Sequence, residues 1–281
     1  MKTIQFQDIV SHVSDLCIKA SVNLPEDVYG CIADAADKER MPRARTILRQ
    51  YLENARIAQQ KDVAICQDTG FAVFLVEIGS EVYIRGGTLN DAISQGVELG
   101  YARGFLRKSI VDDPVFDRIN TGTNTPPIIH VEIVTGDSLH ISLAPKGGGS
   151  ENMSSLAMLK PSDGKEGIIR FVVDSVAHAG ANPCPPTIVG VGIGGTFEKA
   201  AFLAKKALFR PIGSQHPDSR YAEMEQEILK RVNQSGVGAQ GLGGYVTAFA
   251  VHIEKYPCHI ATLPVAVNLN CHAARHAHIT L

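Results

Sequence analysis

Three cysteines of this chain stand far apart from one another, each in a segment typical of a turn. Cys66 precedes a polar stretch that contains Asp68, Cys184 lies among three prolines, and Cys271 follows the polar end of an apolar run. A structural cysteine usually occupies a helix or a strand, where it acts as a small buried hydrophobic residue. Thiols at the ends of separate elements could instead converge on one soft metal centre.

Each of these segments also has an interpretation without a metal. Asp68 could close an Asx-turn on its own backbone, and the prolines beside Cys184 would make a rigid turn whether or not the sulfur binds anything. His272 and His276 could bind zinc from one helix face, but no glutamate lies between them as in H-E-x-x-H, which favours a plain surface helix end. No C-x-x-C occurs, which excludes zinc-ribbon and local ferredoxin patterns.

Two glycine-rich segments and one arginine could bind anions. Successive N–H groups of residues 146–152 could form an anion-binding nest, or the segment could be a flexible loop. Gly190–Gly195 matches G-x-G-x-x-G between a strand and a helix, as in a dinucleotide site, but no second strand with a terminal acidic residue follows. We therefore interpret it as a tight strand-to-helix turn. Arg107 could clamp a carboxylate, although most single arginines are solvated surface residues.

Composition excludes several classes of function. The 281 residues have a formal net charge of -2, whereas a nucleic-acid-binding protein normally has a basic surplus. No apolar run approaches the roughly 20 residues of a membrane span, and Met1–Phe6 lacks the apolar region of a signal peptide. We expect a cytoplasmic protein whose six cysteines are thiols or metal ligands rather than disulfides.

The elements that must position these residues follow from hydrophobic periodicity. Residues 5–60 have helical spacing throughout. Apolar runs typical of strands cover residues 71–78, 128–134, 139–143, 187–193, 246–253 and 260–267. Helical patterns cover residues 89–106, 167–179, 197–208 and 220–234. Thr135–Asp137 predicts a hairpin between two of the strands. We expect one α/β mixed domain over residues 1–281, with an N-terminal helical layer, residues 1–60, packed on a mixed-sheet region.

Five motifs in this order resemble the α subunit of a two-subunit, iron–sulfur (class I) fumarate hydratase. The matching stretches are Cys66–Gly70, Lys146–Asn152, Asn182–Pro186, Val189–Gly195 and Asn268–His272. They extend from about residue 60 to the end of the chain. Each motif alone is weak evidence, whereas five in the family's order are specific.

The resemblance implies a [4Fe-4S] cluster carried by the mixed-sheet region. Its ligands through three irons would be Cys66, Cys184 and Cys271. Because such clusters usually take four thiolates, one iron would keep an open site and act as a Lewis acid. The catalytic residues that it implies are Asp68 and His259, and those that bind the small dicarboxylate substrate are Gln67, Arg107 and Gly148.

The implied reaction is the reversible hydration of fumarate to L-malate, a step of the tricarboxylic acid cycle. Fused members of the family continue into a C-terminal half that carries further catalytic and carboxylate-binding residues, whereas this sequence ends at Leu281. We therefore expect a hydro-lyase that is active only with a separate β subunit, as an α2β2 heterotetramer.

Two alternatives accompany this prediction. The α subunit of L(+)-tartrate dehydratase would share the cluster and fold, but Gly149–Asn152 and Asn270–His272 favour the fumarase version. From another class, the chain could be a non-catalytic metal- or nucleotide-binding module. Its main support is Gly190–Gly195.

Overall fold

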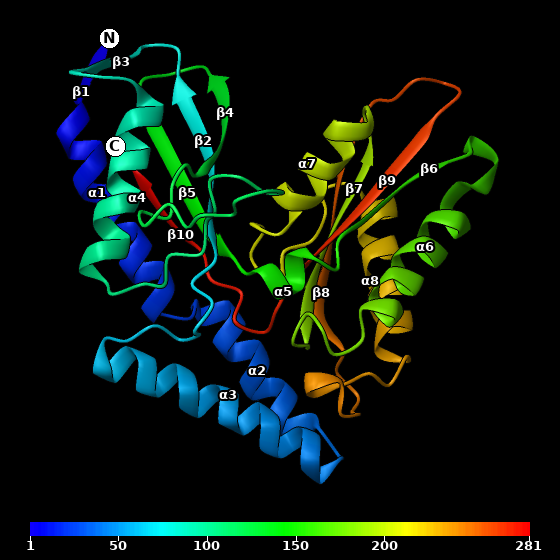
Figure 1. The fold of residues 1–281 in the computed structure, drawn as a ribbon. Helices are drawn as coiled ribbons and strands as arrows, with labels where there is room; N and C mark the ends of the chain where they lie inside the picture. Colours follow the sequence, from blue (N-terminus) through cyan, green and yellow to red (C-terminus); the bar gives the residue numbers. More distant parts are fainter. The chain divides into compact units, whose positions relative to one another are not determined.

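Two four-stranded sheets organise the chain, each in its own compact unit (Figure 1). The computed structural model describes residues 1–281. The first unit consists of Met1–Pro25, Asn54–Gly148 and Arg275–Leu281. The second consists of Glu26–Glu53 and Gly149–Ala274. Both units are therefore assembled from segments that are distant in sequence.

The sheet of the first unit has the strand order β10-β5-β2-β4. Strand β2 is parallel to β4 and antiparallel to β5, and β10 pairs with β5 at the edge. A separate parallel pair joins β1 and β3. The elements are β1 (Lys2–Gln5), α1 (Phe6–Val22), β2 (Phe71–Gly79), β3 (Val82–Arg85), α4 (Leu89–Arg103), β4 (Ile128–Val134), β5 (Leu139–Lys146) and β10 (Ala277–Thr280).

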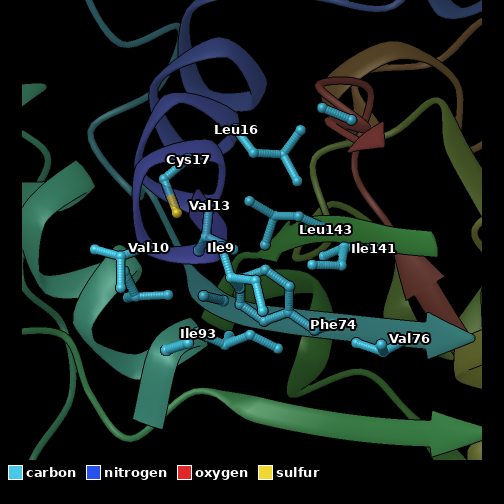
Figure 2. Close-up of a cluster of buried hydrophobic side chains, with 14 of the residues drawn as sticks. Ile9, Val10, Val13, Leu16, Cys17, Phe74, Val76, Ile93, Ile141 and Leu143 are labelled. Carbon is cyan, nitrogen blue, oxygen red and sulfur yellow. The ribbon is translucent and has the colours of Figure 1, made fainter. Parts of the chain in front are cut away.

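The core of the first unit lies between α1, α4 and the sheet (Figure 2). Helix α1 forms because its apolar residues recur every three or four positions and give one buried stripe. That stripe packs on side chains of β2 and β5, each of which contributes about 2 kcal/mol through burial. Members of this core are Ile9, Val13, Leu16, Phe74, Val76, Ile93, Ile141 and Leu143.

The sheet of the second unit has the strand order β6-β9-β7-β8. Strand β7 is parallel to β8 and antiparallel to β9. The elements that lie in this unit are α2 (Glu26–Lys38), β6 (Ser155–Leu159), α6 (Gly164–Ala179), β7 (Thr187–Gly194), α7 (Phe197–Ala207), α8 (Ser219–Asn233), β8 (Ala248–Tyr256) and β9 (Leu263–Asn270). Two further helices cross the boundary between the units in sequence, namely α3 (Pro42–Lys61) and the short α5 (Gly148–Glu151).

Helices cover both faces of this second sheet, with α7 on one face and α6 and α8 on the other (Figure 1). Strand β7 alternates glycine with large apolar residues, so Val189 and Val191 enter the α6–α8 core. On the opposite face a Cβ at Gly190 or Gly192 would collide with backbone of α7. The glycine pattern therefore serves close helix–strand packing, and the positive φ angles of 89° at Gly194 and 70° at Gly195 agree with the interpretation as a tight strand-to-helix turn.

The expected α/β mixed class is confirmed, with N-terminal helices and two mixed sheets. The hairpin prediction is wrong, because β2 lies between β4 and β5 and pairs with both. The turn around Gly136 closes over the end of β2 instead, where Gly79 N–H donates to Ser138 O and Glu81 N–H to Gly136 O, both at 2.9 Å. None of the helices is both long and apolar enough to span a bilayer.

Candidate active site

Cys66 lies in the loop between α3 and β2, in the first unit. Asn54 Nδ2 donates to Ile65 O at 2.8 Å and so fixes the chain just before the cysteine. The half-buried Cys66 Sγ accepts a hydrogen bond from Asp68 N–H at 3.4 Å and lies 3.3 Å from Gln67 Oε1. The Gln67 side chain is exposed. Both Gln67 and Asp68 are thus held beside the sulfur.

The Asp68 carboxylate joins two parts of the first unit. Its Oδ1 accepts from Gly70 N–H at 3.0 Å, which confirms the Asx-turn, and its Oδ2 accepts from Gly148 N–H at 2.8 Å. A Cβ at Gly147 would lie 3.1 Å from the same Oδ2, so any larger residue there would push the carboxylate back by a few tenths of an ångström. The structure therefore brings together Gly148 and Asp68, two residues of the predicted site.

The glycine-rich segment is not a loop or an open nest over its whole length. Strand β5 extends to Lys146, and Gly148–Glu151 forms a single helical turn, α5. Glu151 anchors its end, because its carboxylate pairs with Lys205 at 2.5 Å and accepts from Asn268 Nδ2 at 2.9 Å. The prediction of a loop missed this turn because three successive glycines carry no helical signal.

Three consecutive backbone carbonyls of the Cys66 turn are each bound by a buried side chain. Arg275 Nη2 donates to Asp68 O at 2.8 Å. Tyr101 Oη lies 2.9 Å from Thr69 O and 3.1 Å from Gly70 O. Asn124 Nδ2 donates to Gly70 O at 3.2 Å. Burial raises the pKa of the Tyr101 phenol, so that group stays a donor. The sequence reasoning missed all three residues, and only Arg275, a charged residue within an alanine-rich segment, carried any signal.

Arg107 contacts this turn through its own backbone carbonyl rather than through its side chain. The hydroxyl of the buried Thr69 donates to Arg107 O at 2.9 Å, and the Arg107 side chain is exposed. Cys66, Gln67, Asp68 and Gly148 therefore surround one turn, with Arg107 attached to it at a fixed point.

Cys184 and Cys271 belong to the second unit, where hydrogen bonds connect their segments. Cys184 O accepts from His272 N–H at 3.2 Å and lies 2.9 Å from His272 Nδ1. Cys184 is exposed, Cys271 is half-buried, and Cys184 has a left-handed backbone with φ 53°. The structure thus brings two of the three cysteines together.

Tyr51 of α3 supports this pair of segments. Its ring stacks on His272 with centroids 3.6 Å apart and an interplanar angle of 4°, and its hydroxyl donates to Pro185 O at 3.2 Å. Burial raises the Tyr51 pKa, and a side-chain hydrogen bond with Gln240 opposes this effect in part. The expectation of a helix end at His272 and His276 is wrong, because residues 271–276 are irregular and lead into β10.

His259 is not brought together with these cysteines. It precedes β9, whereas Cys271 follows it, and the eight residues of a strand of this length extend over about 25 Å. Because β7 runs antiparallel to β9, Cys184 lies at the Cys271 end. His259 is exposed and lines a surface cavity with Phe197 and Tyr256. Its catalytic role remains a prediction.

The three cysteines are divided between the units, one in the first and two in the second. Within either unit, no three His, Cys, Asp or Glu side chains form a set that could hold a metal ion. The chemistry around Cys66 nevertheless fits an anionic group. Asp68 N–H already donates to the sulfur, and Arg275 Nε and Nη1 are buried with no hydrogen-bond partner.

Comparison with known proteins identifies the family. The family model described as "Fumarate hydratase (Fumerase)" matches residues 10–280. The chain therefore belongs to the fumarate hydratase family, a family of hydro-lyases, and the predicted resemblance is confirmed at this level.

Individual relatives carry a more specific name. A "Putative L(+)-tartrate dehydratase subunit alpha" of Methanocaldococcus jannaschii is 42% identical over 269 residues, which are 94% of this chain and 94% of that protein. The L(+)-tartrate dehydratase subunit alpha of Escherichia coli strain UTI89 is 36% identical over 94% of this chain and 87% of that protein, and that of strain K12 is 35% identical over the same shares. These relatives support the tartrate dehydratase alternative better than the fumarase version.

Proposed function

We propose that this chain is the α subunit of a two-subunit hydro-lyase that removes water from a C4 hydroxydicarboxylate, with L(+)-tartrate as the substrate. One observation carries the proposal: similarity of 35–42% identity extends over nearly the whole chain to proteins that bear this name. The Asp68 turn is the part of the chain that could perform the chemistry, because the Cys66 thiol contacts the Gln67 amide and the Asp68 N–H there, and the Asp68 carboxylate is held by Gly70 and Gly148.

The cluster ligands in this proposal are Cys66, Cys184 and Cys271. A [4Fe-4S] cluster with three thiolates supplies a Lewis acid at its remaining iron. Support comes from the donor set, from the Asp68 N–H bond to Cys66 Sγ and from the paired segments of Cys184 and Cys271. The proposal treats residues 1–281 as one cluster-binding domain.

Dehydration breaks a C–H bond on one carbon and the C–O bond on its neighbour, and the departing hydroxyl gains a proton to leave as water. Asp68 would carry one of these protons, since Gly70 and Gly148 N–H orient its oxygens. The exposed Arg107 guanidinium and Gln67 amide would bind the substrate carboxylates, together with the backbone at Gly148. Stabilising the carboxylates matters because negative charge develops beside them.

A separate β-type subunit would complete the site. The relatives above are named as alpha subunits, and the reaction needs a second proton carrier besides Asp68. We propose an α2β2 heterotetramer.

Fumarate hydration is the second candidate function. The description of the family model and the residues of Gly149–Asn152 and Asn270–His272 favour it. Loss of water from L-malate gives fumarate, whereas loss of water from tartrate gives an enol that becomes a 2-oxo dicarboxylate. The two reactions therefore have different products.

Substrate assays on the chain co-purified anaerobically with its β-type partner decide between these candidates. L(+)-tartrate, L-malate, fumarate and mesaconate are offered separately, and 2-oxo acid and fumarate are quantified. We expect kcat/KM for tartrate to exceed that for malate or fumarate by about tenfold or more. The opposite ratio selects fumarase, and full turnover by this chain alone contradicts the two-subunit proposal.

Matched variants test the assigned residues in the same complex. Cys66→Ser, Cys184→Ser and Cys271→Ser should each lower the iron content, whereas Cys31→Ser in helix α2 should not. Asp68→Asn should keep its iron and lose roughly 100-fold or more in kcat. An iron content equal to that of wild type in all three cysteine variants would contradict the ligand assignment.

A further inference from the structure

We propose that Arg275 is a positioning residue. Its fixed positive charge, which is hydrogen-bonded to the backbone of the Cys66–Asp68 turn, balances the negative charge of the cluster and of the substrate. This inference rests on the proposed function. It assigns a role to a residue outside the five motifs that carried the resemblance.

The first observation is that Arg275 is buried and incompletely bonded. The residue is only 2% exposed. Its Nη2 donates to Asp68 O at 2.8 Å, but Nε and Nη1 are buried without a hydrogen-bond partner. An arginine stays charged inside proteins, and a buried charge with N–H groups that lack hydrogen-bond partners opposes folding. In the cluster-free chain the Arg275 charge therefore lowers the stability of the fold, and an anion that binds nearby would remove this cost.

The second observation is where this charge lies. The backbone of Asp68 is held on both sides, since its N–H donates to Cys66 Sγ and its C=O accepts from Arg275. The guanidinium is thus joined by hydrogen bonds to the residue that contacts the sulfur. A [4Fe-4S] core with three thiolates is anionic, and the substrate is a dianion. At low dielectric a fixed cation stabilises such charges far more than it would in water.

Tyr101 provides a comparison within the same turn. It binds the next two carbonyls, of Thr69 and Gly70, and it is also buried, but it brings no charge. If Arg275 only anchored the turn, removing its charge would have the same effects as removing the Tyr101 hydroxyl. Charge balance instead predicts different effects for the two residues.

The test compares Arg275→Gln, Arg275→Lys and Tyr101→Phe in the reconstituted complex. Because reduction adds an electron to the cluster, loss of a nearby cation should lower its midpoint potential. We expect a lower potential and about fivefold faster iron release to a chelator in Arg275→Gln, with both largely restored in Arg275→Lys. Tyr101→Phe should leave the potential unchanged. Equal potentials in wild type and Arg275→Gln would overturn the proposal.

Urea unfolding of the cluster-free full chain gives an independent readout. Since a buried charge with two unbonded nitrogens opposes folding, the unfolding midpoint of Arg275→Gln should equal or exceed that of wild type, whereas that of Tyr101→Phe should fall. A midpoint as low as that of Tyr101→Phe would make Arg275 a structural anchor and refute its role as a counter-charge. A wild-type chain that takes up no cluster would refute the proposed function. The urea experiment would still decide whether the Arg275 charge opposes folding.

Discussion

Cys184 has a backbone conformation that residues with a side chain rarely adopt. Its φ of 53° lies in the left-handed region, where a Cβ costs about 1–2 kcal/mol relative to glycine. The segment is otherwise well held, since Cys184 N–H donates to Ala181 O at 3.0 Å and Cys184 O accepts from His272. A strained, exposed cysteine in an ordered turn indicates that its sulfur, rather than its packing, is the reason for its presence.

Replacing Cys184 by glycine should therefore separate stability from cofactor binding. We expect Cys184→Gly to raise the free energy of unfolding of the cluster-free chain by about 1 kcal/mol and to lower iron retention. Urea unfolding and iron analysis measure the two effects. Cys184→Ser, which keeps the strain and loses the thiol, is the control. A glycine variant less stable than the serine variant would contradict this account of the turn.

At this scale the sequence identified the residues that touch one another locally. Cys66, Gln67 and Asp68 were found because three neighbours with useful side chains occur in one short frame. Arg275 was not, because it binds Asp68 from 207 positions away in sequence. A charged residue within an alanine-rich segment is only a weak local signal, and the sequence does not show which distant carbonyl it binds, so the three-dimensional structure is needed to find the contact.

Close approach of α7 to β7 is the feature of the second unit that depends most on glycine. Gly190 and Gly192 face the helix, where a Cβ would collide with the backbone of Ala204 and Ala200. Since backbone atoms on both sides have little freedom to move, the helix would have to shift away from the strand.

We predict that Gly192→Ala destabilises the chain by roughly 2–3 kcal/mol. Gly30→Ala, in helix α2 with no atom near the new Cβ, should instead stabilise it by about 1 kcal/mol. Thermal or urea unfolding of both variants is the measurement. If Gly192→Ala proved neutral, the close packing would not be what requires the glycine.

Periodicity predicted the long elements and missed the short ones. Helices and buried strands were found because their apolar repeats are strong. Strands β6 and β10 were missed, since β6 follows a glycine-rich turn and β10 has only four residues. The hairpin error has another cause, because a turn signal shows that the chain reverses but not which strand pairs beside it.

The two units should differ in their sensitivity to acid. His252, on β8, is buried in the second unit beside an ion pair of Arg210 and Glu225 with an N–O distance of 2.7 Å. Burial, aided by the Arg210 charge, lowers the pKa of His252 from 6.5 to about 4, and the charges of Glu225 and Asp27 oppose this only in part. In the folded protein the imidazole is thus kept neutral, whereas in the unfolded chain it takes up a proton more readily.

The sign of the pH dependence follows directly. Above the unfolded pKa of 6.5 the stability contribution of His252 is complete, and it is lost as the pH falls toward the folded pKa of about 4. The loss amounts to about 3 kcal/mol. We expect hydrogen exchange over this range to increase in β7, β8 and β9 before it increases in β2 and β5.

Two variants control for the carboxylates that also titrate in acid. His252→Gln should flatten the dependence of stability on pH, and His278→Gln, at an exposed position, should leave it unchanged. An unchanged slope in His252→Gln would show that other groups cause the acid sensitivity.

On the scale of the whole chain, the division of the cysteines between two units was beyond sequence reasoning. Each unit combines segments that are distant in sequence. Sequence spacing carries no information about such an assembly, because contacts across more than two hundred positions decide it.

The left-handed turn at Cys184 also has an evolutionary consequence. In a lineage that no longer needs the reaction, selection for stability alone would favour glycine or asparagine at this position, because both adopt positive φ at little cost. Cys184 should then be lost earlier than Cys66 or Cys271, whose φ angles are not positive. Its replacement by glycine in a descendant would mark a chain that has kept its fold and given up its chemistry.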